Sequence, residues 1–457
     1  MERKKRVGAK KRVAKTPIIV KVSLIIIVLF VFFATTFKIV EIIITHKSDN
    51  FPKLEISLSD VPIEQIDANS KDIKYPGNTV KFNTGNESVT YENVEIKGRG
   101  NSTWTRTSKK PYQIKFIEKT SLFGFEKARK WVLLANYFDP TFLRTNLAYY
   151  LESALKTEYP LNGNYIELYI DDVYRGLYYL SEKIEIGKGR VNLENPHGII
   201  MEIDNLRGGP EECHYSKNGE CFLIHDLVDE NNESAATNNF LETFDKLESA
   251  IKEKDYDTVT SLIDVDSFAT YFLLNEFLVN PDAYSSSFYM YKNGEGDKIH
   301  AGPGWDFDIT IGTKNNTYDF SHSPLETMAL KEYANSVPRK TGPTTELSSP
   351  AQAISTILYD LMDIPEFEQR VKEIYQETLS GRGEELLDYI KSQAEYIKPA
   401  VLRDQKRWKS KTNFDEEVDY LIDWVAKRYD HFEQTYGAKA QETSSGPAPE
   451  SPQPSQE

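Results

Sequence analysis

The segment "NPDAYSSSFYMYKNGEGDKIHAGPGWDFDITIG", residues 280–312, decides how this sequence is interpreted. It places three aspartates, Asp282, Asp306 and Asp308, among aromatic, small and turn-forming residues. Burial beside aromatic rings penalises a charged carboxylate unless a partner compensates its charge. We therefore expect a divalent cation and a polyphosphate at this segment.

The local pattern predicts how the three carboxylates meet. The helix "DSFATYFLLNEFLV", capped by Asp266, is expected to end before Pro281, because a residue that precedes proline disfavours helical angles. Asp282 then lies in the loop after the helix. "SFYMYKN" and "KIHAG" flank the turn residues "GEGD" and predict a β-hairpin. In an extended second strand, Asp306 and Asp308 would point the same way.

Phosphoryl transfer needs this kind of arrangement. One carboxylate orients the attacking hydroxyl group and another holds magnesium against the phosphates of the nucleotide. Asp282 and Asp306 are 24 residues apart, which leaves room for a hairpin between them. A single loop aspartate is more often a turn residue that binds backbone amides. Three that converge favour a functional site.

A glycine-containing bend offers a second element of a nucleotide site. "EIKGRGNSTW", residues 95–104, places Gly98, Arg99 and Gly100 between two strands, where a phosphate can approach the backbone closely. An ordinary hairpin turn is the simpler explanation of these glycines. The bend gains weight from the strand "KKPYQIKF", which follows it directly.

The strand "KKPYQIKF" supplies a candidate lysine for the phosphates. Lys115 ends the alternating run "YQIK", as the phosphate-binding lysine ends the kinase strand V-A-I-K. Lys110 is the alternative, and a solvated surface lysine is equally plausible. Glu152, in a helix expected to begin at Asp139, is a candidate partner for that lysine. Glu182, in "GLYYLSEKI", is a candidate contact for adenine, although both glutamates are also compatible with a surface position.

Alternation and helical spacing together predict an α+β fold. Strands are expected in "NTVKFN", "VTYENVEIKGRG", "PYQIKF", "YIELYIDD" and "YRGLYYLSEKI". Helices dominate after them, beginning with "SAATNNFLETFDKLESAIKE" and ending with "DEEVDYLIDWVAKRYDHFEQTY". A β-rich part followed by a helical part suggests two lobes with a cleft between them. We expect this domain to span residues 46–437, followed by a disordered Pro/Ser/Glu-rich tail over 438–457.

The N-terminus predicts a membrane anchor. Residues 1–17 are strongly basic, and the apolar run that begins at residue 18 rises roughly 30 Å as a helix, enough to cross a bilayer. Cations on its N-terminal side place that side in the cytoplasm. A cleaved signal peptide is the alternative. We expect the anchor to extend over residues 18–45 and the folded domain to lie outside the membrane.

The distribution of charge limits which classes of molecule the folded domain is expected to bind. The chain carries a formal charge of −15 and the first fifteen residues carry +7, which leaves −22 for the remainder. That balance argues against a nucleic-acid partner and favours cations or basic protein segments.

The only two cysteines, Cys213 and Cys221, flank a turn-forming Asn-Gly. They are either a disulfide, as in an oxidising compartment, or two free thiols.

Taken together, several motifs resemble the CotH kinases, a family named for a bacterial spore-coat protein. The matching pieces occur in family order over roughly residues 90–315: "KGRGNSTW", "KKPYQIKF", "KWVLLANYFDPTFLRTNLAYYL", "YRGLYYLSEKI", "NPDAYSSSFYMYKN" and "GPGWDFDITIG". The resemblance implies an atypical protein kinase, secreted or at the cell surface, that transfers phosphate from ATP to Ser or Thr. It also implies a catalytic role for Asp282 and a metal-binding role for Asp306, with Asp308 as a further ligand.

One position departs from the kinase pattern. Five residues after its catalytic aspartate, a protein kinase has an asparagine that binds a second metal ion, and here that position is Ser287, a poorer ligand for magnesium. We expect a membrane-anchored kinase that uses ATP with Mg²⁺ or Mn²⁺ on a protein substrate, basic and Ser-rich. A non-catalytic surface or spore-coat scaffold is the alternative. A glycosidase explains neither the glycine-containing bend nor Lys115.

Overall fold

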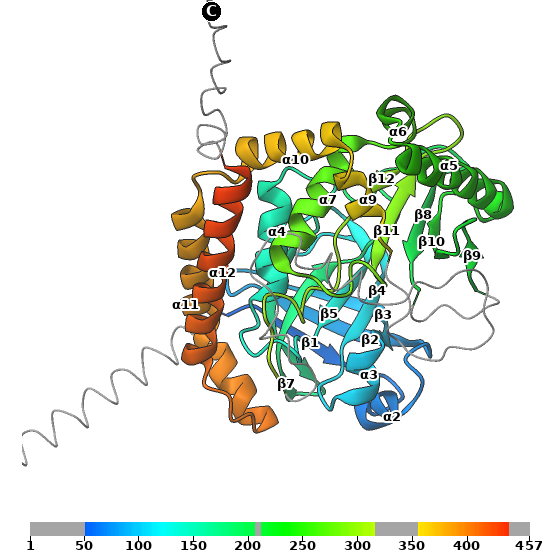
Figure 1. The fold of residues 1–457 in the computed structure, drawn as a ribbon. Coiled ribbons are helices and arrows are strands. Elements are labelled where there is room, and N and C mark those ends of the chain that lie inside the picture. The colour runs from blue at the N-terminus through cyan, green and yellow to red at the C-terminus, as the bar shows by residue number, and fades with distance from the viewer. Residues whose placement is uncertain (1–50, 206–211, 316–354, 438–457) are drawn as a thin grey trace, which may run out of the picture. The chain divides into compact units, whose positions relative to one another are not determined.

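A computed structural model describes residues 51–205, 212–315 and 355–437, and Figure 1 shows their fold. The predicted anchor over 18–45 and the predicted tail over 438–457 lie outside these ranges. Within them, the structure contains no helix that is both long and apolar enough to span a membrane.

The first half of this part of the chain is a closed β-barrel in the order β1-β2-β3-β4-β5-β7-β6. Neighbouring strands are antiparallel, except that β1 closes the barrel by pairing in parallel with β6. The strands are β1 (Lys53–Ser57), β2 (Tyr75–Asn83), β3 (Ser88–Gly98), β4 (Tyr112–Thr120), β5 (Ala128–Leu134), β6 (Gly163–Ile170) and β7 (Val173–Glu182). The five strands predicted from alternation are confirmed as β2, β3, β4, β6 and β7.

Alternating apolar residues fill the barrel. In β4, Tyr112, Ile114 and Phe116 point inward and belong to one buried cluster with residues of the other strands. The residues between them, such as Lys115, therefore point to the outer face. Two short helices, α2 (Ile63–Ala68) and α3 (Ser102–Arg106), contribute apolar residues to the same cluster.

A second, smaller sheet follows in the order β12-β11-β8-β10-β9. Its strands are β8 (Ile199–Ile203), β9 (His214–Tyr215), β10 (Cys221–Leu227), β11 (Phe288–Lys292) and β12 (His300–Ala301). The predicted hairpin is confirmed as β11 and β12, whose register pairs Met290 with Ala301. Cys213 and Cys221 form a disulfide beside β9, with 5.1 Å between their Cα atoms, so they are not free thiols.

Helices make up most of the remaining described residues, as predicted. They are α4 (Arg144–Ala154), the 3₁₀ helix η1 (Glu230–Asn232), α5 (Glu233–Glu253), α6 (Tyr256–Leu262), α7 (Val265–Leu278), α9 (Ile357–Met362), α10 (Pro365–Thr378), α11 (Gly383–Trp408) and α12 (Phe414–Tyr436). Figure 1 shows α11 and α12 side by side, and α11 also contacts β7 of the barrel. The fold is therefore mixed α+β, with a β-rich N-terminal region and a helical C-terminal part.

Two predicted helix starts need correction. Helix α4 begins at Arg144 and not at Asp139, whose carboxylate instead accepts the backbone N–H of Thr141 at 2.9 Å and closes a turn before the helix. Helix α7 is capped by Asp264, whose side chain accepts the N–H of Ser267 at 2.8 Å. Asp266, the predicted cap, already lies in the first turn of that helix.

Candidate functional site

The three aspartates come from two loops that flank the β11–β12 hairpin. Helix α7 ends at Leu278, as expected before Pro281. Asp282 begins a turn in which its carbonyl oxygen accepts the N–H groups of Ser285 and Ser286 at 2.9 and 2.8 Å. The sequence therefore predicted the place of Asp282 in the fold, although its side-chain role stays a prediction.

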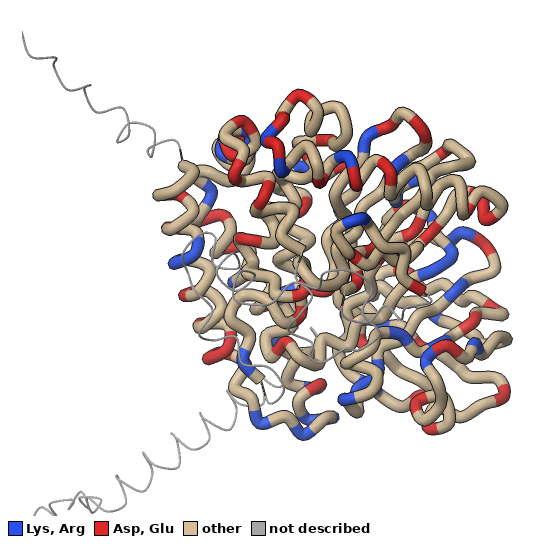
Figure 2. The backbone as a smooth tube through the Cα atoms, turned by 45° about the vertical axis from the view of Figure 1, so that its right-hand side comes forward, with Lys and Arg blue, Asp and Glu red and all other residues tan. Residues whose placement is uncertain are grey.

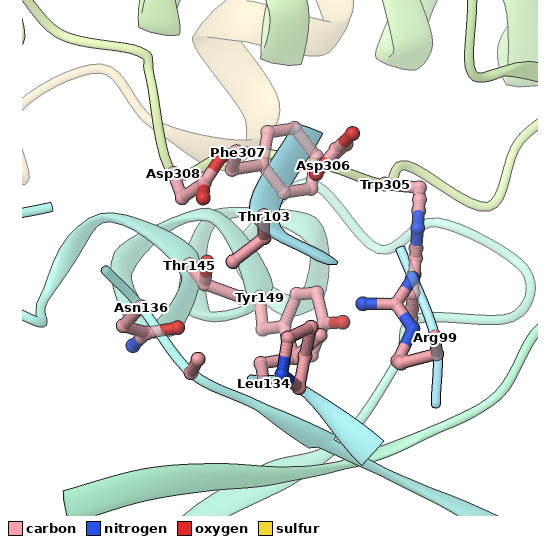
Figure 3. Close-up of a pocket in the computed structure, with 12 residues that line it drawn as sticks. Arg99, Thr103, Leu134, Asn136, Thr145, Tyr149, Trp305, Asp306, Phe307 and Asp308 are labelled. Atoms are coloured by element: carbon pink, nitrogen blue, oxygen red, sulfur yellow. The ribbon is translucent and has the colours of Figure 1, made fainter. Parts of the chain in front are cut away.

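The segment that carries Asp306 and Asp308 is a loop and not a strand. Strand β12 ends at Ala301, and Asp306 has a φ angle of 64°, in the left-handed region. The prediction that both carboxylates point the same way is wrong, because this reversal breaks the alternation of an extended chain. In Figure 3 the two side chains lie on either side of Phe307 and point in different directions.

Buried contacts from three helices fix this acidic loop, residues 302–313. From α4, the Arg144 side chain donates to the carbonyl oxygens of Thr310 at 2.8 Å and Ile311 at 3.2 Å, while its guanidinium pairs with Asp139 at 2.5 Å. The N–H of Ile311 donates to the last residue of α7 at 2.8 Å. From α12, the Tyr420 hydroxyl donates to Gly312 at 3.1 Å. The loop is therefore positioned by elements far apart in the sequence.

The negative charges of neighbouring carboxylates act on Asp308. Its pKa lies well above the usual range, first because the carboxyl is desolvated, and then because Asp306 and Asp282 repel its negative charge. Asp139 adds to this repulsion, and Arg99 opposes it. A bound cation would relieve this crowding of like charge.

An open pocket of about 400 Å³ lies beside Asp306 and Asp308. The other residues that line it come from the bend before α3, α3 itself, the residue before β4, the end of β5, helix α4 and the acidic loop: Arg99, Thr103, Pro111, Leu134, Ala135, Asn136, Thr145, Tyr149, Trp305 and Phe307. Figure 3 shows the Arg99 side chain reaching into this pocket beside Trp305, and its guanidinium lies 5.3 Å from the centre of that ring.

The glycine-containing bend reaches the site through Arg99. A Cβ atom on Gly98 would lie 2.5 Å from the Trp104 ring and 2.8 Å from the Cα of Lys71, so packing accounts for this glycine. Gly100 has a φ angle of 76°, which favours glycine. The backbone thus turns tightly, and the residue between the glycines is the one that lines the pocket.

Neither candidate lysine lines the pocket. The Lys110 ammonium donates a hydrogen bond to the carbonyl oxygen of Trp104 and lies 5.4 Å from the centre of its ring. Lys115 lies on the outer face of the barrel, partly exposed, opposite Glu95 on one side and Lys130 on the other. The strand "YQIK" therefore lies in the barrel that borders the pocket, but its lysine does not reach the pocket. The cation that lines the pocket beside the carboxylates is Arg99.

The two candidate glutamates are both buried, and neither contacts Lys115 or Lys110. Glu182 pairs with Arg190 and accepts the N–H of Asn162 at 2.9 Å. Glu152 accepts the N–H of Gly304, in the acidic loop, at 2.7 Å. Burial raises the pKa of Glu152 to about 8. Glu152 therefore holds the loop in place and is not the partner of a lysine.

Sequence reasoning missed a group of residues on the β7–β8 connection and the second sheet. His225 lies 3.4 Å from the Lys183 ammonium, and its ring packs edge-on against Tyr289 with 4.8 Å between centres. Glu202 accepts the N–H of Ser287 at 3.2 Å. No spacing in the sequence links these residues, because they lie on three strands that pair only in the folded sheet.

The chain offers oxygen ligands that suit a divalent cation. In the three described ranges, no group of three or more His, Cys, Asp or Glu side chains is arranged to hold a metal ion alone. Magnesium, however, is usually held by one or two carboxylates together with substrate phosphates. Asp306 and Asp308 beside an open pocket fit that requirement, and Ser287, whose side chain is buried, adds no carboxylate.

Comparisons with known proteins confirm the resemblance drawn from the sequence motifs. A family model described as "CotH kinase protein" matches residues 96–432. The chain is also similar to the inner spore coat protein H of Bacillus subtilis (strain 168), with 22% identity over 338 residues, which cover 70% of this chain and 81% of that protein. The candidate site residues from Gly98 to Asp308 all lie within the matched family range.

Proposed function

Because this chain belongs to the CotH kinase protein family, we propose that it is an ATP-dependent protein kinase that phosphorylates Ser or Thr. The observation that carries this proposal is that Asp306 and Asp308 line one pocket together with Arg99. A carboxylate cluster facing a cation is what a metal–triphosphate complex requires of a protein. The barrel and the helical part would then form the two lobes of a kinase-like fold.

Each aspartate has a distinct role in this proposal. The Asp282 carboxylate orients the substrate hydroxyl group and accepts its proton, while the hydroxyl oxygen bonds to the γ-phosphorus and ADP leaves. Asp306 and Asp308 hold Mg²⁺ or Mn²⁺. Such a metal ion, when bound, neutralises charge on the phosphates. Arg99, which lines the pocket beside Trp305, binds phosphate oxygens.

The proposed setting is outside the cytoplasmic membrane, with the chain anchored by residues 18–45. A disulfide between Cys213 and Cys221 agrees with an oxidising compartment. Figure 2 shows basic residues interspersed with acidic ones along the described chain. With a formal charge of −22 after the first fifteen residues, the protein suits a basic, Ser-rich protein substrate better than nucleic acid.

A phosphotransfer assay on the full chain in detergent tests the enzyme. With ATP, magnesium and a Ser/Lys-rich protein, we expect Asp282→Asn and Asp306→Asn each to lower the rate at least 100-fold, because each removes a group needed in the transition state. Asp257→Asn is the matched control, since Asp257 is exposed on α6. Equal phosphate incorporation by all four proteins would contradict kinase activity.

The second candidate function is a non-catalytic scaffold on the same fold. The observation that favours it is Ser287, which stands where a protein kinase has its second metal-binding side chain. A thermal shift separates the two candidates, because a ligand that binds the native state stabilises it. A saturable rise in Tm with ATP and magnesium supports the enzyme. A Tm that does not move at any nucleotide concentration supports the scaffold.

A further inference from the structure

A second pocket, of about 300 Å³, lies beside the start of the acidic loop. Gly302 and Gly304 line it, whereas Asp306 and Asp308 line the pocket of the candidate site. Its other walls come from the end of α4, the loop that follows α4, helix α7 and strands β11 and β12. Among the described residues that line this second pocket, none is a lysine or an arginine. The pocket has no part in the proposed phosphotransfer.

Glu158 supplies negative charge to this pocket. Its Oε2 atom accepts the hydroxyl group of Tyr291 at 2.6 Å and lies 3.1 Å from His300 Nδ1. The Tyr159 hydroxyl group also hydrogen-bonds to this carboxylate. The contacts with His300 and Tyr291 hold the pKa of Glu158 at about 2, so the side chain is ionised at neutral pH. A carboxylate has about four acceptor positions, which leaves room for a further donor.

Aromatic rings form part of the wall beside that carboxylate. The rings of Tyr159 and Tyr291 lie 5.6 Å apart between centres and are inclined by 60° to each other. His300 stacks on Tyr291 at 4.9 Å, and Tyr271, on α7, lines the pocket as well. The face of an aromatic ring carries negative potential and attracts cations. Two inclined rings beside a carboxylate are therefore suited to a cationic group.

The hydroxyl groups of the pocket already donate their protons to the backbone. Thr157 donates to a carbonyl oxygen of α4 at 3.3 Å. Thr270 and Ser267 donate to carbonyl oxygens at the start of α7 at 2.9 and 2.7 Å. The N–H of Gly304 is likewise engaged, since it donates to Glu152 at 2.7 Å. These groups still offer oxygen lone pairs, so a ligand has to supply the hydrogen-bond donors.

The charge, the rings and the free lone pairs together define the chemistry of the ligand. An anion would meet the ionised Glu158 without a lysine or arginine in the described wall to compensate it. A primary alkylammonium group brings one positive charge and three N–H donors. A quaternary ammonium group brings the charge alone, and an alcohol brings a donor without the charge. The primary ammonium group satisfies both the carboxylate and the hydroxyl oxygens.

We propose that the second pocket binds a primary alkylammonium group, which donates hydrogen bonds to Glu158, Thr157 and Thr270. The methylene groups next to the ammonium lie against the rings of Tyr159 and Tyr291. This site is separate from the metal and nucleotide pocket, and it does not depend on the proposed kinase activity. A lysine side chain of another protein and a free aliphatic diamine both carry the required group.

Titration calorimetry on the full chain in detergent tests this site with three ligands of similar size. We expect butylammonium to bind about tenfold more tightly, or better, than 1-butanol, which lacks the charge, and tetramethylammonium, which lacks the donors. Glu158→Gln keeps the shape and removes the charge, so it should weaken butylammonium binding by about tenfold or more. Glu253→Gln, at an exposed position on α5, is the matched control and should bind like the wild type.

Two substitutions at one position test the aromatic wall. Tyr159→Phe keeps the ring and should retain most of the affinity for butylammonium, whereas Tyr159→Leu should weaken it by roughly threefold or more. Wild-type affinity in Glu158→Gln would overturn the site, and so would equal binding of butylammonium, 1-butanol and tetramethylammonium, or no saturable binding of butylammonium.

Two further ligands identify the source of the ammonium group. Nα-acetyl-lysine amide represents a lysine side chain, and 1,4-diaminobutane represents a free diamine. Tighter binding of the lysine derivative assigns the pocket to a protein lysine, and tighter binding of the diamine assigns it to a free amine. The phosphotransfer assay is independent of these titrations, so loss of one proposal leaves the other standing.

Discussion

At the scale of single residues, Glu152 links the core of α4 to the acidic loop. Its carboxylate accepts the N–H groups of Gly304 at 2.7 Å and Leu161 at 3.4 Å. Only 1% of the residue is exposed. Burial raises its pKa from an ordinary 4.5 to about 8, so the carboxyl is mostly protonated at neutral pH. The loop that carries Asp306 is therefore held by a neutral acid.

This raised pKa predicts a pH-dependent stability. The folded state holds the proton more tightly than the unfolded state, so the stabilisation is complete below pH 4.5 and is lost as the pH rises through about 8. At about 1.4 kcal/mol per pKa unit, the loss amounts to several kcal/mol. We expect Glu152→Gln, which mimics the protonated acid, to be less sensitive to pH between 5 and 9 in thermal unfolding.

The comparison needs a second variant and a clear contrary result. Glu158→Gln is the control, because Glu158 is about half exposed and pairs with His300 at 3.1 Å. Its pKa is lowered to about 2, so it contributes in the opposite direction and at lower pH. If wild type and Glu152→Gln lose Tm in parallel up to pH 9, the carboxyl is ionised in the folded protein and the prediction fails.

At the scale of elements, the turn between β3 and α3 depends on close packing at Gly98. A Cβ there would lie 2.5 Å from the Trp104 ring and 2.8 Å from a backbone atom of Lys71, which cannot move aside cheaply. We expect Gly98→Ala to destabilise the fold by about 1–3 kcal/mol, as overpacking usually does. Because Arg99 follows directly, nucleotide binding should weaken as well.

Urea unfolding at constant pH checks this prediction. Gly187→Ala is a suitable control, since a Cβ at Gly187 would meet no atom within 4 Å. Equal unfolding midpoints for the two variants would show that the turn adapts to the added methyl group without strain.

The elements also show what the sequence can and cannot reveal. Long alternating runs identified five barrel strands and the β11–β12 hairpin, because alternation follows directly from a sheet with one buried face. Strand β8 escaped, since a strand buried on both faces has no alternation and "IIMEI" is apolar at nearly every position. Capping was misplaced at α4, where Asp139 closes a turn ahead of the helix, and at α7, where Asp264 and Asp266 competed for one helix start.

The candidate site, like the fold, was only partly predictable from the sequence. Asp306 and Asp308 line one pocket, as residue type and spacing suggested, although the reversal of the backbone at Asp306 was not predicted. Lys183 follows the end of β7, whereas His225 and Glu202 lie on β10 and β8, which pair only in the folded sheet. Which cation faces the carboxylates is decided by tertiary packing. A strand motif alone therefore favoured Lys115, which lies on the outer face of the barrel and does not line the pocket.

At the scale of the whole molecule, a buried ion pair joins the barrel to the C-terminal helices. Lys109 and Asp404 are 295 positions apart in the sequence and meet at 2.5 Å, with their side chains 1% and 6% exposed. Asp404 also accepts the N–H of Leu177 at 2.8 Å, and Lys109 donates to the Leu177 carbonyl at 2.6 Å. Helix α11 is thereby fastened to strand β7.

Removal of one partner should destabilise the entire domain. Lys109→Met leaves the Asp404 carboxylate buried without its cation, and breaking a buried pair in this way costs about 3–5 kcal/mol. The expected result is a single cooperative transition at lower urea concentration. Lys391→Met, in the exposed pair with Asp388, should change stability by less than about 1 kcal/mol. Two separate transitions in Lys109→Met would instead show that barrel and helices unfold independently.

The closure of the barrel by β1 has a consequence for how the domain can be released from its N-terminal segment. Lys53–Ser57 pairs with β2 on one side and β6 on the other. A protease that cut after β1 would remove this strand from the barrel. Strands β2 and β6 would then become exposed edge strands that can pair with another copy of the protein. Proteolytic release of a domain that does not self-associate must therefore cut the chain before Lys53.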